Sequence, residues 1–347
     1  MAKIALIPGD GIGVDVTREA AKLLRCVASK STIPLELSEW DLGAERYLRT
    51  GISVTDEEMA QLAAHDAIFL GAMGDARVPD NKHARDILLG MRFRFDLYIN
   101  LRPVRLLDAR FCPLKDVKED DIDIVIFREN TEGLYVGIGG AFKRGTADEV
   151  ATETDVNTRK GVERIIRAAF EYARTNKRER VTLTDKANAM ENAGQLWRRV
   201  FKEVAAEYSE IKTNAVYVDA LALDLVRRPA AYDVIVAGNL FGDIISDLAA
   251  ALVGGLGLAP SANLHPGRAG LFEPVHGSAP DLVGTGKANP LAAILTVGLM
   301  LQQLGHPELN TKIEAVVQHA LKENKTTPDL GGSMNCSGVG DWICENL

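Results

Sequence analysis

The chain has 347 residues, of which 46% are hydrophobic and 25% are charged, and this balance is typical of a folded protein with about two domains. Its formal net charge of −8, with no block rich in Lys or Arg, argues against nucleic acid as a partner because a phosphate backbone would be repelled. The longest apolar stretch, residues 291–301, is shorter than the roughly 18 residues of a membrane span, so no membrane partner is expected.

The four cysteines are scattered along the chain without a C-x-x-C pair, which argues against a zinc knuckle and against a disulfide framework. The apolar run after the N-terminal Met is too short for a signal peptide. We therefore expect a protein of a reducing compartment, the cytoplasm.

Short β-rich runs alternate with longer segments of helical period, the pattern of strands that cross over through helices into a largely parallel sheet. The predicted strands cover residues 4–8, 67–71, 122–127, 181–184, 215–218 and 233–238. Apolar residues at helical spacing predict core-facing helices over residues 162–173 and 196–208.

Three glycines, Gly9, Gly11 and Gly13, follow the first predicted strand and precede a helical segment. Their spacing is not that of the dinucleotide fingerprint G-x-G-x-x-G, because the third glycine comes one residue early. Two interpretations stay open, a tight strand-to-helix turn and a loop whose backbone approaches a ligand. Residues 284–288 fail as a phosphate loop, because Asp281 replaces the first glycine of that motif and Ala288 replaces its Ser or Thr.

The segment over residues 137–155 is rich in Gly, Thr and charged residues. Its short alternating pieces indicate an excursion from the main sheet, such as a hairpin arm. A mobile loop and an arm that contacts another subunit both fit this composition.

Two carboxylates, Asp243 and Asp247, stand four residues apart in a segment that follows a predicted strand and opens a helix. At this spacing they share one helix face, where a hard divalent cation could bind. The alternative is that both only favour the helix N-terminus through its dipole. Their mutual repulsion favours the cation, and oxygen ligands without a nearby His or Cys favour Mg²⁺ or Mn²⁺ over zinc. Asp219, at the end of another predicted strand, is a candidate third ligand.

Arginines supply the opposite charge. Arg92 and Arg102 lie on either side of a hydrophobic stretch, and Arg128 ends a predicted strand. If they converge, their guanidinium groups would bind the carboxylates of a small polyanionic substrate, whereas singly each fits a surface ion pair. Tyr135 and Lys186 are candidate proton carriers if they lie buried near a cation, and structural residues otherwise.

Six motifs in chain order together resemble the β-decarboxylating dehydrogenase family, which includes isocitrate, 3-isopropylmalate, homoisocitrate, tartrate and D-malate dehydrogenases. They are IPGDGIG (7–13), DLYINLRP (96–103), RENTEGLY (128–135), DKAN (185–188), NLFGDIISD (239–247) and EPVHGSAPD (273–281). One such motif alone would be weak evidence, but six in order are highly specific.

The resemblance implies an α/β fold of two domains with a central cleft, the isopropylmalate/isocitrate dehydrogenase-like fold, which is not a Rossmann fold. The large, cofactor-binding domain is expected over residues 1–97 and 254–347, and the small domain over 98–253 forms a homodimer. The arm near 137–155 is expected to interlock the subunits, and the cleft to hold an active site that the two subunits share.

The resemblance also assigns the site residues. Tyr135 and, from the other subunit, Lys186 form the catalytic acid/base pair. Substrate binding falls to Leu88, Leu89, Arg92, Arg102, Arg128 and Asp219. Asp243 and Asp247 of one subunit surround Mg²⁺ or Mn²⁺ together with Asp219 of the other. The residues expected to bind the cofactor are Glu273, His276, Gly277, Ser278, Ala279, Asp281 and Asn289.

These parts imply the oxidation of a 2-hydroxy acid followed by loss of its 3-carboxylate. Lys186 collects the hydroxyl proton, the metal stabilises the negative charge of the enolate, and Tyr135 protonates C3. NAD is expected rather than NADP, because Asp281 matches the residue that accepts the adenosine ribose hydroxyls and would repel a 2′-phosphate.

The substrate is narrowed by the segment that carries Arg92. Leu88 and Leu89 match the paired leucines that isopropylmalate enzymes set against the isopropyl group, which favours 3-isopropylmalate and leucine biosynthesis. Arg85 stands where such enzymes have Glu, and a cation there could favour a diacid, so D-malate, tartrate and homoisocitrate remain alternatives. A binding module that kept the fold but lost activity is the alternative of another class, and every catalytic position being filled argues against it.

Overall fold

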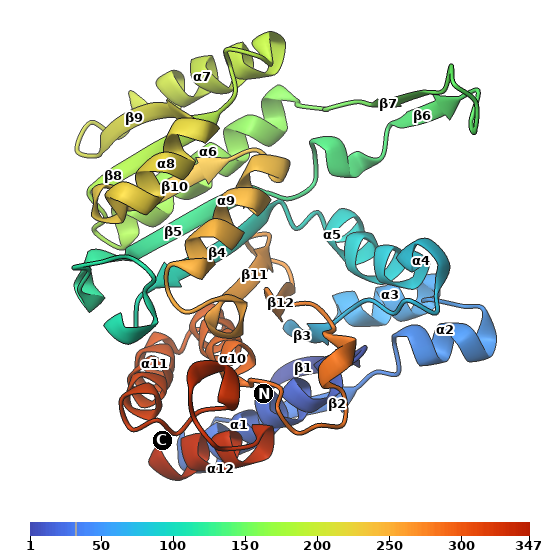
Figure 1. Cartoon of the computed structure of the whole chain (residues 1–347), viewed down its shortest axis with the longest axis vertical. Coiled ribbons are helices and arrows are strands. Elements are labelled where there is room, and N and C mark those ends of the chain that lie inside the picture. The colour runs from blue at the N-terminus through green and yellow to red at the C-terminus, as the bar shows by residue number, and fades with distance from the viewer. Residues whose placement is uncertain (32) are drawn as a thin grey trace. The chain divides into compact units, whose positions relative to one another are not determined.

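The computed structural model describes residues 1–31 and 33–347, and the chain divides into two compact units (Figure 1). Unit 1 comprises Met1–Leu97, Arg102–Ile122 and Ala250–Leu347, and unit 2 comprises Tyr98–Leu101 and Asp123–Ala249. Unit 1 is therefore discontinuous along the chain. The predicted boundaries give residues 102–122 to the smaller domain, whereas in the structure they pack with unit 1.

Five strands of unit 1 pair in the order β2-β1-β3-β12-β11. They are β1 (Ala2–Gly9), β2 (Leu35–Glu39), β3 (Ala67–Ala72), β11 (Pro260–Leu264) and β12 (Gly270–Pro274). The pairs that β1 makes with β2 and β3 are parallel, as is β3 with β12, while β11 and β12 are antiparallel. The pairs of β1 and β3 agree with the largely parallel sheet that the alternating pattern predicts, and the β11–β12 pair is an antiparallel addition to it.

The helices of unit 1 lie between and after these strands along the chain. They are α1 (Gly13–Ser31), α2 (Ala44–Thr50), α3 (Asp56–Ala63), α4 (Lys82–Ala84), α5 (Gly90–Arg94), α10 (Leu291–Gln303), α11 (Pro307–Lys322) and α12 (Cys336–Asn346). One π-helical turn, Arg85–Leu89, joins α4 to α5, so residues 82–94 form a continuous helix. We call this element the 82–94 helix.

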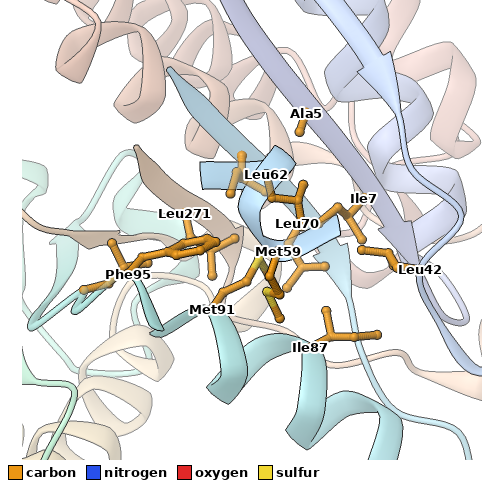
Figure 2. Close-up of a cluster of buried hydrophobic side chains, with 12 residues drawn as sticks. Ala5, Ile7, Leu42, Met59, Leu62, Leu70, Ile87, Met91, Phe95 and Leu271 are labelled. Carbon is orange, nitrogen blue, oxygen red and sulfur yellow. The ribbon is translucent and has the colours of Figure 1, made fainter. Parts of the chain in front are cut away.

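Both faces of β1 are buried, which explains its uninterrupted apolar sequence. Ala5 and Ile7 belong to a cluster that also contains Met59 of α3 and Ile87 and Met91 of the 82–94 helix (Figure 2). Residues on the other face of the strand, such as Ile4 and Leu6, are equally buried, and α1 contacts β1.

Unit 2 contains four parallel strands in the order β5-β10-β8-β9. They are β5 (Asp123–Glu129), β8 (Arg180–Asp185), β9 (Lys212–Tyr217) and β10 (Val234–Ala237). The helices are α6 (Arg159–Thr175), α7 (Glu191–Ala205), α8 (Val218–Arg227) and α9 (Asn239–Ala251). Because parallel strands end at the same edge of a sheet, the segments that follow β5, β8, β9 and β10 gather there.

The predicted helix stripes are confirmed. In α6 every residue of the stripe is 0% exposed, and in the other stripe, which starts within α7, all are buried except the half-buried Leu196. All six predicted strands are present, with bounds that differ by at most three residues. The strands β2, β4 (Ile99–Arg105), β11 and β12 were not predicted.

The segment 137–155 forms a two-stranded antiparallel hairpin of β6 (Gly139–Phe142) and β7 (Val150–Glu153). It projects from the rest of unit 2 and is almost wholly exposed (Figure 1). The hairpin interpretation is thus confirmed, and its contact with another subunit stays a prediction. No helix in the described ranges is long and apolar enough to cross a membrane.

Candidate active site

Arg128 is the second-to-last residue of β5, and its side chain is buried in unit 2. Nε and Nη2 donate to the side-chain oxygen of Asn239 at 3.0 and 2.8 Å, and Nη1 donates to Oδ1 of Asp243 at 2.6 Å. Gly242 permits this approach, because a Cβ there would lie 2.7 Å from Cβ of Arg128. The arginine is therefore fixed in orientation by the first two turns of α9.

Tyr135 shares the same carboxylate. Its hydroxyl donates to Oδ2 of Asp243 at 2.6 Å, and its ring centroid lies 5.1 Å from Cζ of Arg128. A predicted proton carrier and a predicted substrate-binding arginine thus both contact a predicted metal ligand that lies more than 100 residues away in the chain.

The predicted metal ligands occupy two helices. Asp243 and Asp247 are on α9, where Asp243 is half-buried and Asp247 exposed, and Asp219 is exposed at the start of α8. Within the described part of this single chain, no three His, Cys, Asp or Glu side chains gather as a metal site requires. Completion of the site by Asp219 of another subunit stays a prediction.

Lys186 follows β8, and its Nζ donates to Oδ1 of Asp219 at 2.5 Å. The hydrogen bond from Lys186 is the main cause that lowers the pKa of Asp219. The second predicted proton carrier and the third predicted ligand are therefore held together at the same edge of the sheet. One chain thus carries two groups of site residues, Arg128–Tyr135–Asp243 and Lys186–Asp219.

The loop after β5 is shaped by Glu129, which is 2% exposed. Its carboxylate accepts hydrogen bonds from the backbone N–H groups of Thr131 and Glu132 at 2.9 and 2.7 Å, and one from the Thr131 hydroxyl at 2.8 Å. Burial raises the pKa of Glu129, and this effect outweighs the hydrogen bonds, which lower it. The carboxyl therefore fixes the turn that leads to Tyr135.

Unit 1 contains the other two predicted arginines. Nη2 of Arg92 lies 2.9 Å from Oε1 of Glu273, which also accepts a bond from Asn263 at 2.9 Å. Nε of Arg92 is buried without a partner among the described residues, so one donor stays available. Arg102 is 7% exposed on β4. Arg92 is therefore joined to a residue that was predicted to bind the cofactor.

The 82–94 helix presents the predicted specificity residues. Ile87 and Met91 are buried in the cluster of Figure 2, Leu88 is half-buried and packs against the same cluster, and Leu89 is half-buried. Arg85 is exposed to solvent. The helix is therefore anchored through Ile87 and Met91, and both leucines remain partly accessible.

The predicted cofactor segment, residues 273–281, begins with the last two residues of β12 and ends within a short helical turn, Pro280–Leu282. Burial lowers the pKa of His276, and its Nε2 is buried with no partner within the described ranges. A Cβ at Gly277 would meet open space, Ala279 has a φ of +38°, and Asp281 is exposed. The segment thus combines an unsatisfied ring nitrogen with accessible backbone.

Ser278 and Asn289 are engaged within the chain. The Ser278 carbonyl accepts a hydrogen bond from Ile12 N–H at 2.9 Å. Asn289 is 7% exposed and donates to Asp329 at 2.9 Å, while its oxygen accepts from Leu291 N–H at the start of α10. Their side chains and backbone support the segment in addition to any role toward a ligand.

Of the two interpretations of the glycine turn after β1, the structure favours a tight, closely packed turn. Gly9 has a φ of +69° and a Cβ there would lie 1.9 Å from the Ala72 carbonyl oxygen; Gly11 has a φ of +57° and a Cβ there would lie 2.0 Å from the Ser278 carbonyl oxygen. Both positions require glycine for conformation and for space. The turn packs against Ala72 and against Ser278 of the segment 273–281.

Two residues with clear roles were missed from the sequence. Asn239 orients Arg128 through its oxygen, and its amide donates to the Glu132 carbonyl at 2.9 Å. Asp10 is buried with three hydrogen-bond donors around it. Both residues occur inside the quoted motifs and directly after an apolar strand. This position of a polar residue was the signal that could have identified them.

Comparisons with known proteins place this architecture. Residues 3–343 match the family model described as isocitrate/isopropylmalate dehydrogenase. The 3-isopropylmalate dehydrogenase of Thermobifida fusca (strain YX) is 45% identical over 99% of this chain and 97% of that protein. The 3-isopropylmalate dehydrogenase of Streptomyces coelicolor is 47% identical over 99% of this chain and 98% of that protein.

Solved structures agree with the sequence relatives. The crystal structure of isocitrate dehydrogenase from Methylococcus capsulatus superposes with a TM-score of 0.90 at 36% identity, covering 100% of this chain and 99% of that one. Fold and sequence thus lead to the same result across nearly the whole length. The chain belongs to the isocitrate/isopropylmalate dehydrogenase family.

Proposed function

We propose that this chain catalyses the NAD-dependent oxidative decarboxylation of 3-isopropylmalate to 4-methyl-2-oxopentanoate, a step of leucine biosynthesis. The observation that carries the proposal is the contact group of Arg128, Tyr135 and Asp243, which joins a carboxylate receptor, a proton donor and an oxygen ligand. The relatives named as 3-isopropylmalate dehydrogenases over nearly full length support the same substrate.

The residues present fit a hard divalent cation. Asp219, Asp243 and Asp247 offer carboxylate oxygens, which suit Mg²⁺ or Mn²⁺. The segment 273–281 likewise fits the adenosine half of NAD, since Nε2 of His276 is buried without a partner in the described part of the chain. When bound, the cation supplies Lewis acidity and the nicotinamide accepts the hydride from C2.

The chain's own side chains do the binding and the proton transfers. Arg92, Arg102 and Arg128 bind the substrate carboxylates through forked hydrogen bonds. Lys186, as the free amine, takes the proton of the 2-hydroxyl. After the 3-carboxylate has left as carbon dioxide, Tyr135 gives its phenolic proton to C3, for which the hydroxyl must turn away from Asp243.

A homodimer with shared active sites is part of the proposal. The helices that carry the carboxylates also expose apolar side chains: Leu223 and Val226 on α8 are 56% and 46% exposed, and Ile244 on α9 is 55% exposed. Such a surface suits a second copy of the chain. Because Lys186 holds Asp219 within one chain, a partner would deliver both residues together.

The substrate assignment depends on the 82–94 helix. Two half-buried leucines suit the isopropyl group better than a third carboxylate, and the exposed Arg85 leaves no buried cation to favour a diacid. A cytoplasmic location belongs to the same proposal, because the four cysteines are free thiols, as is usual in a reducing compartment.

A panel of acids tests the proposal. Purified protein with NAD and Mg²⁺ or Mn²⁺ is offered 3-isopropylmalate, D-malate, tartrate, homoisocitrate and isocitrate, and NADH absorbance is followed. The highest kcat/KM is expected with 3-isopropylmalate. A preference for another acid would reassign the substrate within the family, and no NADH with any acid would favour a binding module that has lost activity.

A further inference from the structure

A buried carboxylate–imidazole pair lies beneath the proposed substrate-binding helix. Asp10, in the glycine turn after β1, is 5% exposed, and His83 of the 82–94 helix is 0% exposed. Nε2 of His83 lies 2.7 Å from Oδ2 of Asp10, and because a carboxylate only accepts, Nε2 carries the hydrogen. Tyr47 stacks on the imidazole at 6.2 Å between ring centroids.

Asp10 is the one polar partner of His83 among the described residues, since Nδ1 of the ring is buried without a hydrogen bond. The same carboxylate accepts from the backbone N–H groups of Ala44 at 2.6 Å and Gly74 at 2.7 Å. Asp10 therefore ties three segments together: the start of α2, the loop after β3 and the 82–94 helix.

The opposite side of the glycine turn supports the proposed cofactor segment. Ile12 N–H donates to the Ser278 carbonyl, and Gly11 packs so closely on Ser278 that only a glycine fits. One rigid turn thus contacts residues 273–281 through its backbone and the 82–94 helix through Asp10.

The 82–94 helix needs such an anchor because of its π turn. Gly90 N–H reaches back to the Arg85 carbonyl, which widens the helix where Leu88 and Leu89 are presented. Ile87 and Met91 bury one face in the apolar cluster of Figure 2, Asp86 accepts from the Ser53 hydroxyl at 2.8 Å, and Arg92 donates to Glu273 at 2.9 Å. The bond from His83 to Asp10 is a further directional contact, and it fixes the rotation of the first turn of the helix, where neither of those two bonds lies.

We propose that Asp10 and His83 are positioning residues that set substrate selectivity by fixing Leu88, Leu89 and Arg92 relative to residues 273–281. The inference rests on the proposed function, because it takes the two leucines as the contact with the C3 substituent. A displacement of about 1 Å at a substrate-positioning group can lower catalytic efficiency by roughly 100-fold, so loss of this anchor should be measurable.

Two substitutions of His83 separate positioning from packing. In His83→Gln the side-chain amide can place an N–H donor close to the position of Nε2, whereas His83→Leu fills similar space without a donor. Thr296→Val is the matched control, because Thr296 is 0% exposed and loses one hydrogen bond, to the Ala292 carbonyl in α10, away from the helix.

The main readout is the ratio of kcat/KM for 3-isopropylmalate to that for D-malate, which lacks the isopropyl carbons. We expect His83→Leu to lower this ratio by roughly tenfold, mainly through KM for 3-isopropylmalate, and His83→Gln to stay within about threefold of the wild type. An unchanged ratio in folded His83→Leu, or an equal loss in His83→Gln and Thr296→Val, would overturn the proposal.

Hydrogen exchange gives a second readout that needs no turnover. Amides of residues 85–94 should exchange roughly tenfold faster in His83→Leu but not in His83→Gln, with α11 unchanged in both. If His83→Leu does not fold, Asp10→Asn takes its place. The amide of asparagine has one accepting oxygen and one donating NH2 group, so the NH2 group must face either the Ala44 N–H or the Gly74 and His83 donors. Absence of this local change would overturn the positioning role even if wild-type protein proved inactive on every acid, so the two proposals fail separately.

Discussion

Tyr135 donates its phenolic hydrogen to Oδ2 of Asp243 at 2.6 Å, so the proposed proton donor is held by a proposed metal ligand. Arg128 occupies the other oxygen of this carboxylate at 2.6 Å. The carboxylate thus orients the phenol before substrate arrives, and removal of its hydroxyl alone should leave the arginine and the ligand in place.

Tyr135→Phe should therefore lower kcat for 3-isopropylmalate by roughly 10²–10⁴, the usual contribution of a positioned general acid, while the Tm changes little. Steady-state NADH production measures it. Tyr232→Phe is the matched control, since Tyr232 also donates to a carboxylate, that of Asp224, at 2.7 Å. Equal kcat values for the two variants would remove Tyr135 from the mechanism.

Active sites shared between subunits predict complementation. Lys186→Ala and Tyr135→Phe are each expected to be inactive, but a heterodimer of the two would contain one site with both residues intact. If the two chains pair at random in a symmetric dimer, the mixture should recover about a quarter of wild-type activity. Differently tagged chains allow the heterodimer to be isolated, and an inactive heterodimer would show that each subunit works alone.

The fold followed from the sequence where strands are buried on both faces. Residues 4–7 of β1 are 0% exposed, and their uninterrupted apolar run made the strand evident. The edge strand β2 is only partly buried and gave no such run. In β11 the buried Asn263 interrupts the pattern, and the Pro266-Gly267 turn before β12, where Gly267 has a φ of +81°, was the unused sign of an antiparallel hairpin.

The candidate site was predictable as residue types but not as contacts. The four-residue spacing of Asp243 and Asp247 is local, and the helix that contains both confirms it. The bonds from Arg128 and Tyr135 to Asp243 span 115 and 108 residues, and no local rule predicts such pairs. Arg85 is exposed at the start of a π turn, for which the sequence carries no recognisable signal.

Cofactor choice should depend on Asp281, which is exposed at the end of the segment 273–281. Its carboxylate would accept ribose hydroxyls and repel a 2′-phosphate, so wild-type kcat/KM should be at least tenfold higher with NAD than with NADP. Asp281→Lys should narrow or reverse that ratio. Glu323→Lys, an equal charge change at another exposed position, is the control, and comparable wild-type efficiency with both cofactors would contradict the assignment.

Acid sensitivity is expected at the cap of α3, beneath the 82–94 helix. Arg46 binds both carboxylate oxygens of Glu58 at 2.6 and 2.8 Å, and Thr55 N–H adds a bond at 2.8 Å. These contacts, the Arg46 bond first, lower the pKa of Glu58 to about 2 from an ordinary 4.5. A lowered folded-state pKa stabilises the fold above pH 4.5, and that stabilisation is lost as pH falls toward 2.

Glu58→Gln should therefore lower the free energy of unfolding by about 1–2 kcal/mol at pH 7, and by less at pH 3. Urea unfolding at the two pH values measures the difference. Glu57→Gln, on the exposed side of the same turn, should cost less than about 0.5 kcal/mol. A deficit of Glu58→Gln that is as large at pH 3 as at pH 7 would show that the ion pair is not its cause.

Substrate selectivity should depend on Leu88 and Leu89 and not on Arg85, because the leucines are half-buried on the 82–94 helix while the guanidinium is in solvent. Burial of a few methyl-sized groups contributes about 1–3 kcal/mol, so 3-isopropylmalate should exceed D-malate by roughly 10–200-fold in kcat/KM. Leu88→Ser should reduce that ratio, and Arg85→Glu should leave the efficiency with 3-isopropylmalate and with homoisocitrate within about threefold of the wild type, as expected of an exposed charge. Assays of the wild type and of Arg85→Glu with these two acids distinguish selectivity set by the leucines from selectivity set by Arg85. A wild-type preference for homoisocitrate that Arg85→Glu reverses would mean that the arginine reaches the substrate. That result would replace the isopropylmalate assignment and leave Tyr135, Lys186 and the three arginines in their proposed roles.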